Sequence, residues 1–247
     1  MKHNNPASQD SRIAILAFEL LTVLLLAFLL FSMYRMNRFA SEAGTTYEHL
    51  MQCVQADNLL TTGSDILTNA VREYVVSGDK TYRERYFEEA YSIKHREMGL
   101  ETAPALPNGE KLEKDLVAGM KHSVDLMLLE YHAMRLVTPE EELSSCPPEI
   151  RDYTLSDEEL AASHPERRKM ATRLVFGKEY SNYKEQIHNS LDMSLESAIL
   201  FYSNRRKDIL DRYRQYYYCS MLALAGTPLL QALCFFLMYR RYAKTKT

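Results

Sequence analysis

The stretch of residues 64–82, SDILTNAVREYVVSGDKTY, carries the pattern from which the fold can be predicted. With the residues before it, it places small and large apolar side chains on one seam of a helix, at an alternating four-three spacing. These are Ala56, Leu60, Gly63, Leu67, Ala70 and Tyr74. Gly78 is predicted to supply the left-handed residue that ends this helix, and Asp79 the cap of the next one. The stretch therefore predicts an antiparallel helical hairpin.

Two apolar stretches lie near the ends of the chain, at residues 13–34 and 217–239. Each is long enough to cross a hydrocarbon core of roughly 30 Å as a helix. We expect the first to be an uncleaved anchor, because its apolar run exceeds the roughly 7–15 residues of a signal-peptide core and no small-residue cleavage motif follows. The sequence therefore predicts a protein that spans the lipid bilayer twice.

The two spans divide the chain into predicted parts: a tail at 1–12, a span at 13–34, a central region at 35–216, a span at 217–239 and a tail at 240–247. Loops longer than roughly 60 residues are translocated largely regardless of their charge, so the short ends set the orientation. We expect both tails in the bacterial cytoplasm and the central region outside the cytoplasmic membrane. Tyr34 with Arg35, and residues 216–218 with Arg214, are predicted interface anchors on the outer side.

The sequence of the central region predicts helices. No proline interrupts residues 38–76, so the first span is expected to continue as one long helix. Further helices are predicted over about 80–98, 110–137 and 177–214, with an irregular stretch at 144–165 in which a capping box at Ser156 opens a short helix. The predicted fold class is all-α: two transmembrane helices flanking an extracytoplasmic, antiparallel domain like a four-helix bundle.

Motifs for catalysis or metal binding are missing from the sequence. Glu185 and His188 form one Glu-x-x-His pair, whereas a di-iron bundle needs two. The sequence has no CxxC, HExxH, phosphate-binding glycine loop or nucleophile elbow, so we expect no enzyme, catalytic residue, metal or cofactor. A formal net charge of −3 gives no reason to expect nucleic acid as a partner. Cys53 and Cys146 would face an oxidising compartment, but nothing in the sequence sets the distance between them.

Aromatic and basic side chains gather around the predicted hairpin turn. They are Arg72, Tyr74, Tyr82, Arg83 and Tyr86. Arginine beside tyrosine at a helix N-terminus suits a small anionic ligand, through bidentate hydrogen bonds and the helix dipole. The alternative is structural, with Tyr74 and Tyr86 in the core. It pairs Arg72 with Asp65, Glu73 or Asp79.

A second aromatic group lies near the irregular stretch. It comprises Tyr153, Phe176, Tyr180 and Tyr183. Long irregular segments are often functional, so this part is either a lid over the helices or a simple connector.

The run at residues 64–82 also resembles the extracytoplasmic sensor segment of bacterial transmembrane signalling proteins: membrane-anchored diguanylate cyclases, sensor histidine kinases and chemoreceptor-like proteins. The shared pattern is Ser-Asp-x-Leu-Thr-x-x-x-Arg-x-Tyr-Val-Val-Ser-Gly-Asp-x-x-Tyr. The resemblance covers residues 60–96 and returns at 128–134 and 175–205. It implies a sensory input module that detects a ligand or partner and passes a helix shift through the membrane. It also implies a homodimer, with which a coiled-coil-like seam is compatible.

In such proteins the second span is followed by a kinase, cyclase or chemotaxis signalling domain, whereas eight residues follow the predicted span here. We therefore expect either an isolated sensor piece or a chain that acts through a separately encoded signalling protein. The alternative function is that of an accessory or structural two-span membrane protein, which binds another membrane or envelope protein.

Overall fold

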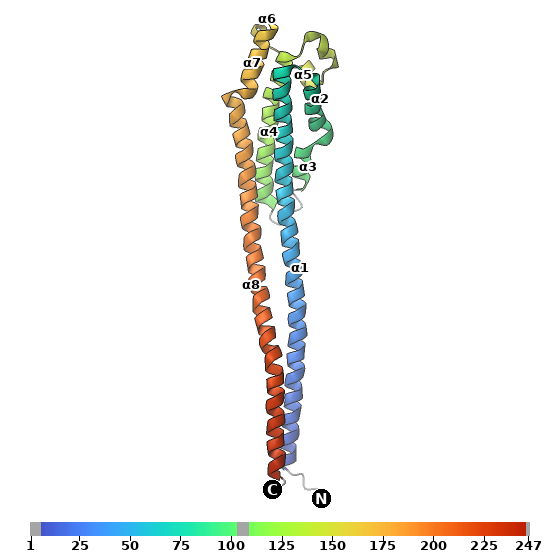
Figure 1. The fold of residues 1–247 in the computed structure, drawn as a ribbon, viewed down its shortest axis with the longest axis vertical. Coiled ribbons are helices and arrows are strands. Elements are labelled where there is room, and N and C mark those ends of the chain that lie inside the picture. Colours follow the sequence, from blue (N-terminus) through green and yellow to red (C-terminus); the bar gives the residue numbers. More distant parts are fainter. Residues whose placement is uncertain (1–5, 103–108, 246–247) are drawn as a thin grey trace. The chain divides into compact units, whose positions relative to one another are not determined.

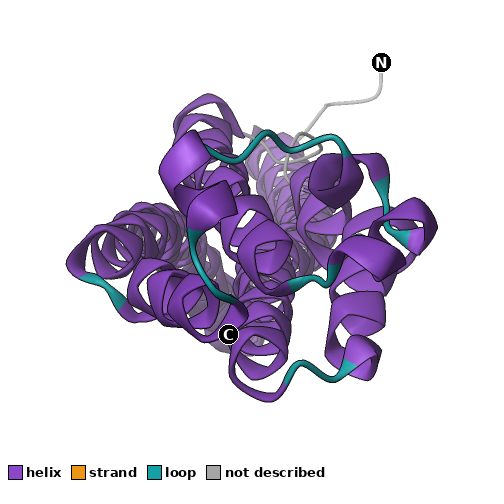
Figure 2. Ribbon diagram, turned by 90° about the horizontal axis from the view of Figure 1, so that it is seen from above, coloured by secondary structure: helices purple, strands orange, loops and turns teal. Residues whose placement is uncertain are grey.

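The computed structural model describes residues 6–102 and 109–245. Every regular element in this part of the chain is a helix, and no strand occurs in it (Figures 1 and 2). The elements are α1 (Pro6–Ser77), α2 (Lys80–Glu88), the π-helix η1 (Glu89–Ile93), α3 (His95–Thr102), α4 (Gly109–Val137), the 3-10 helix η3 (Glu140–Ser145), α5 (Pro148–Arg151), α6 (Asp157–Ala161), α7 (His164–Phe176) and α8 (Lys178–Thr245). The prediction of an all-α fold is confirmed.

The hairpin turn between α1 and α2 forms as the sequence predicts. Gly78 has a positive φ of 75°, a conformation in which any other side chain would be strained, and its amide donates to the Tyr74 carbonyl oxygen over 2.8 Å. The Asp79 carboxylate then accepts a hydrogen bond from the Thr81 amide at 2.9 Å and caps α2. The seam from Ala56 to Tyr74 on α1 is buried along its whole length.

The second predicted helix is interrupted, which corrects the expectation of one helix over 80–98. The backbone passes from α2 into the π-helix η1, and Lys94 takes a left-handed φ of 58° before α3 begins. The buried Glu89 carboxylate accounts for the new start, because it accepts from the His95 amide at 3.0 Å and thereby caps α3. π-Helical turns of this kind often occur at functional sites.

The later boundaries follow local signals. Ser156 and Glu159 form the predicted capping box at the start of α6, and Ser163 with Glu166 forms another at the start of α7. Helix α8 then runs from Lys178 to Thr245 with Pro228 inside it.

The chain divides into two compact units: Glu48–Tyr202, here called the compact unit, and Met1–Tyr47 together with Ser203–Thr247, here called the helix pair. The compact unit has a core drawn from α1, α2, α4, α5, α7 and α8. Its largest fully buried hydrophobic side chains are Leu67, Tyr74, Tyr86, Leu116, Leu126, Met134, Leu136, Ile150, Tyr180 and Ile187. Helices α1 and α8 are joined within it by Lys184, whose Nζ lies 2.8 Å from Asp65 Oδ1 and 3.1 Å from Ser64 Oγ.

The helix pair has few inward-facing side chains. Ser32 of α1 is fully buried and its Oγ shares a hydrogen bond with Ser220 of α8, while Phe39 lies beneath the Tyr216 ring with 2% of its surface exposed. Most of its large apolar side chains face outward. By length and composition, α1 and α8 each contain a segment apolar enough to cross a membrane.

The cysteines of the described part are unpaired. Cys53 and Cys146 are both free and buried in the compact unit, so the possible disulfide between them is not formed. Burial raises the pKa of the Cys53 thiol to about 11, which keeps it protonated near neutral pH.

Candidate functional site

The five residues predicted as a ligand site lie in three different surroundings. Arg72 is half-buried at the surface of the compact unit, Tyr74 and Arg83 share a buried polar chain, and Tyr86 is fully buried. Tyr82 is partly buried and packs against the core. The turn therefore brings the five residues near one another in sequence, but tertiary packing separates their roles.

Arg72 is joined by residues of the second aromatic group. Its Nε donates to the Val175 carbonyl oxygen at 3.0 Å, and its guanidinium carbon lies 4.9 Å from the centroids of both the Phe176 and the Tyr180 rings. Nη1 and Nη2 have no hydrogen-bond partner among the described residues. Two rings and a carbonyl oxygen hold the guanidinium in place, and Nη1 and Nη2 remain as hydrogen-bond donors on its other edge. The structural alternative is confirmed in placing Tyr74 and Tyr86 in the core, but no carboxylate of the described part pairs with Arg72 as it also expected.

Tyr74 and Arg83 belong to a chain of hydrogen bonds. Arg83 Nη1 donates to the Tyr74 hydroxyl at 3.2 Å, and the Tyr74 hydroxyl lies 2.9 Å from Thr138 Oγ1. Thr138 Oγ1 in turn donates to the Met134 carbonyl oxygen at 2.7 Å, so Tyr74 must be the donor to Thr138. Glu142 lies 3.5 Å from Arg83 Nη1 and is shared with Lys80, whose Nζ lies 3.0 Å from it. Internal partners therefore already engage the Tyr74 hydroxyl and Arg83 Nη1.

Tyr86 takes part in the most deeply buried polar contact of the compact unit. Its hydroxyl donates to Glu130 Oε2 at 2.7 Å, and the Tyr180 hydroxyl donates to Glu130 Oε1 at 2.6 Å. Glu130 has 1% of its surface exposed, and this burial raises its pKa, although the two tyrosine hydrogen bonds and the charge of Arg96 act in the opposite direction. One carboxylate thereby ties together α2, α4 and α8.

Sequence reasoning did not select Glu130 as a site residue, although a signal was present. Glu130 falls on the apolar face of α4, three or four residues from Leu126, Met127, Ala133 and Met134, which are all buried. An acidic residue in the middle of such a face needs buried hydrogen-bond donors. The sequence cannot say that these donors are Tyr86 and Tyr180.

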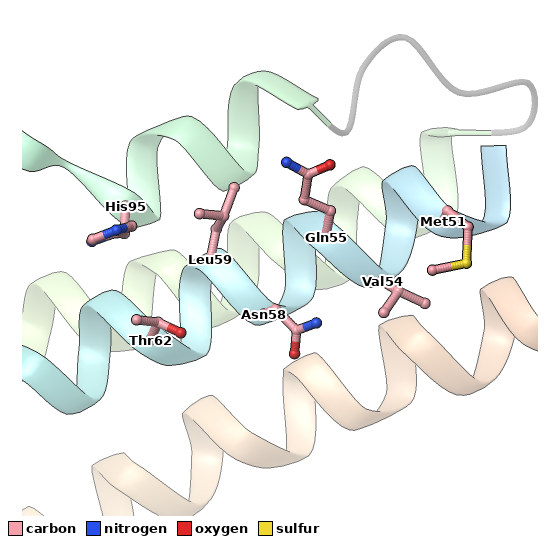
Figure 3. Close-up of a pocket in the computed structure, with 7 residues that line it drawn as sticks. All are labelled: Met51, Val54, Gln55, Asn58, Leu59, Thr62 and His95. Atoms are coloured by element: carbon pink, nitrogen blue, oxygen red, sulfur yellow. The ribbon is translucent and has the colours of Figure 1, made fainter. Parts of the chain in front are cut away.

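A second open surface lies along α1. This surface is a groove with a volume of about 410 Å³, lined by Met51, Val54, Gln55, Asn58, Leu59 and Thr62 of α1 and by His95 of α3. Figure 3 shows these lining side chains. His95 Nδ1 lies 2.8 Å from Glu89 Oε2, so the buried carboxylate accepts its hydrogen and fixes the ring. The opposite ring nitrogen, Nε2, has no partner among the described residues.

Two glycines allow α3 to lie close enough to α1 to form this groove. A Cβ on Gly99 would meet the Ala56 carbonyl oxygen at 2.7 Å, and a Cβ on Gly63 would meet Arg96 Cγ at the same distance. Arg96 is buried beside them, with Nη1 2.9 Å from Ser123 Oγ. The close approach places the Glu89–His95 pair against α1.

A metal site is not evident in the described residues, where no group of three or more His, Cys, Asp or Glu side chains is arranged to hold an ion. Comparison with protein-family models, with curated proteins and with solved structures finds no match to this chain. The function of the chain therefore has to be inferred from its own residues and their contacts.

Proposed function

We propose that the chain is the membrane-anchored sensory input module of a bacterial signal-transduction receptor. The observation that carries this proposal is that α1 and α8 each contain an apolar, membrane-length segment and also supply core side chains to the compact unit. A ligand that moves either helix in the compact unit would act on the backbone of a helix that crosses the membrane. The compact unit is then extracytoplasmic, and both chain ends face the cytoplasm.

In this proposal the compact unit works as an antiparallel domain like a four-helix bundle, built from α1, the broken α2–α3 segment, α4 and α8. Its support is the set of contacts between these helices: Glu130 with Tyr86 and Tyr180, and Lys184 with Asp65. Two copies would associate as a homodimer. Buried polar contacts between helices give such a domain discrete packing arrangements, which a two-state signal requires.

The proposed ligand is a small anion held by Arg72. The guanidinium is fixed by Phe176 and Tyr180, and its free edge presents two donors in the geometry that a carboxylate accepts. Tyr180 contacts Arg72 with its ring and donates its hydroxyl hydrogen to Glu130. A ligand that moves Arg72 would therefore also disturb the buried contact between α2, α4 and α8.

A thermal-shift screen of the purified full chain in mild detergent, against amino acids, organic acids and other small metabolites, tests the sensor function. A ligand at 100 times its Kd adds about 2.7 kcal/mol to the free energy of unfolding, a shift of a few degrees in Tm. Arg72→Gln should abolish the shift, whereas Arg173→Gln, a change at an exposed arginine of α7, should leave it intact.

Two other outcomes redirect the proposal. A shift that survives Arg72→Gln but disappears with His95→Gln would move the ligand to the groove beside α3. A negative screen over a broad library would count against a small-molecule sensor.

The accessory function has one observation in its favour. Helix α4 carries Val117, Val124 and Leu128 at a spacing of seven and four residues, and all three are exposed. This apolar stripe would suit a partner protein. Loss of a co-purifying membrane protein from a Val124→Lys, Leu128→Lys double variant, together with the negative screen, would favour that alternative.

A further inference from the structure

The exposed side chains of the helix pair change from apolar to basic at one level along its length. On one side of this level the large exposed side chains are apolar, and they include Leu30, Phe31, Met33 and Tyr34 of α1 and Tyr217, Tyr218, Met221 and Leu222 of α8. On the other side, residues 35–42 and 205–214 carry seven arginine and lysine residues against three acidic ones, a net charge of +4. We call these basic side chains the collar: Arg35, Arg38, Arg205, Arg206, Lys207, Arg212 and Arg214.

Aromatic contacts fix the register of the collar across the two helices. The Arg35 guanidinium carbon lies 4.9 Å from the Phe39 ring centroid and 5.7 Å from that of Tyr216, while that of Arg212 lies 5.8 Å from the Phe39 centroid. Arginines from both helices therefore contact the same buried ring. Charges far apart in sequence are held at one level.

Most of the collar charge is not neutralised within the chain. Arg205 pairs with Glu42 at 2.5 Å and Arg214 with Asp211, but Arg35, Arg38, Arg206 and Arg212 have no carboxylate partner among the described residues. Arg35 itself is partly exposed, and its guanidinium has no hydrogen bond to another described residue.

We infer that the collar binds the phosphate groups of anionic phospholipids. Arginine presents a fork of donors that matches phosphate oxygens, and basic residues next to a membrane-crossing helix are attracted to anionic lipid by about a fivefold gain in affinity each. The tyrosines at 34, 216, 217 and 218 lie at the same boundary, as interfacial aromatic side chains do. The inference rests on the proposed membrane span, and it names the lipid class that the outer end of the span selects.

The test is native mass spectrometry of the full chain, purified in detergent and mixed with equimolar phosphatidylglycerol and phosphatidylcholine. The wild-type chain should retain phosphatidylglycerol in preference. Replacing Arg35, Arg38, Arg206 and Arg212 together by glutamine should lower this preference by at least about tenfold. The matched control replaces four exposed basic residues of the compact unit by glutamine: Lys121, Lys169, Arg173 and Lys178. It should bind lipid like the wild type.

Several results would overturn the inference. They are equal binding of the two lipids by the wild type, an unchanged preference in the collar variant, and an equal loss in the control. Loss of the preference on adding millimolar inorganic phosphate would assign the collar to free anions instead. Should the glutamine variant fold poorly, the same four residues replaced by lysine keep the charge and must keep most of the preference. Resistance of the chain to alkaline carbonate extraction is measured separately. It shows whether the chain spans the membrane, and so distinguishes an error in the proposed span from an error in the lipid-binding role of the collar.

Discussion

The compact unit and the helix pair place most of their apolar side chains differently. In the compact unit, apolar residues fill the interior and the polar groups among them are hydrogen-bonded, as at Glu130. In the helix pair, most large apolar residues face outward, and the serine pair Ser32 and Ser220 lies between the helices with a few buried apolar residues such as Phe39. The first pattern is that of a domain that folds in water, because folding there removes apolar surface from contact with water. The second pattern is stable where the surroundings are themselves apolar.

The two regions should therefore lose stability through different kinds of substitution. A buried charge in the compact unit depends on its partners, because an unmatched polar group in a low dielectric is costly. The helix pair has little core to lose, so single changes between its helices should cost less. Four substitutions test this contrast, each measured on the full chain in mild detergent.

Glu130→Ala should have the largest effect. It leaves the hydroxyls of Tyr86 and Tyr180 buried without an acceptor, and the free energy of unfolding should fall by about 3 kcal/mol. The measurement is the urea midpoint followed by far-UV circular dichroism. Glu130→Gln retains one acceptor oxygen and should cost less. A variant as stable as the wild type would mean that the tyrosines find other partners.

Gly99→Ala should rank second. The new Cβ would lie 2.7 Å from the Ala56 carbonyl oxygen, a backbone atom that cannot move without shifting α1. We expect a loss of about 2 kcal/mol, which outweighs the gain of up to about 1 kcal/mol from alanine in a helix. Gly44→Ala is the control in the helix pair, because nothing lies within 4 Å of the position that the new Cβ would take. This substitution should stabilise the chain. Destabilisation by both changes would remove the contrast.

Asp57→Asn should raise stability at neutral pH. Burial, with the nearby charge of Asp192, raises the pKa of Asp57 to about 6, while His188 opposes the shift. The folded state therefore binds a proton more tightly than the unfolded state, and wild-type stability falls as pH rises from about 4 to about 6. The variant should be more stable by on the order of 1 kcal/mol at pH 7.5, since Asp57 is partly exposed and solvent screens its charge. Thermal melts at pH 4 and 7.5 should show this advantage at pH 7.5 and none at pH 4; the same advantage at both would exclude the titration.

Replacing Ser32 and Ser220 together by alanine should have the smallest effect. The hydrogen bond between these side chains is a polar contact between the apolar segments of the two helices, and such contacts between membrane helices contribute about 0.6 kcal/mol on average. Unfolding in increasing dodecyl sulfate measures the change. A loss comparable with that of Glu130→Ala would show that the pair depends on its interior as strongly as the compact unit does.

The candidate site shows how far sequence reasoning reaches. The Gly78 turn, the Asp79 cap and the buried seam of α1 were predictable because each depends on residues within one or two helical turns. The break at Lys94 was not, since it depends on the Glu89 side chain folding back onto the start of α3. The ligand-binding role of the five predicted residues stays a prediction.

The all-α class, the two apolar membrane-length segments and most helix boundaries are readable from the sequence, because caps, periodicity and apolar runs are local signals. The contacts of Arg72 with Phe176 and Tyr180, which lie more than a hundred residues away, and those of Tyr86 and Tyr180 with Glu130 arise from the packing of the helices. Such pairings depend on how helices approach and rotate, and similar apolar faces fit together in several ways. The buried hydrogen bonds select one of them, since in any other packing Glu130 would lack its partners.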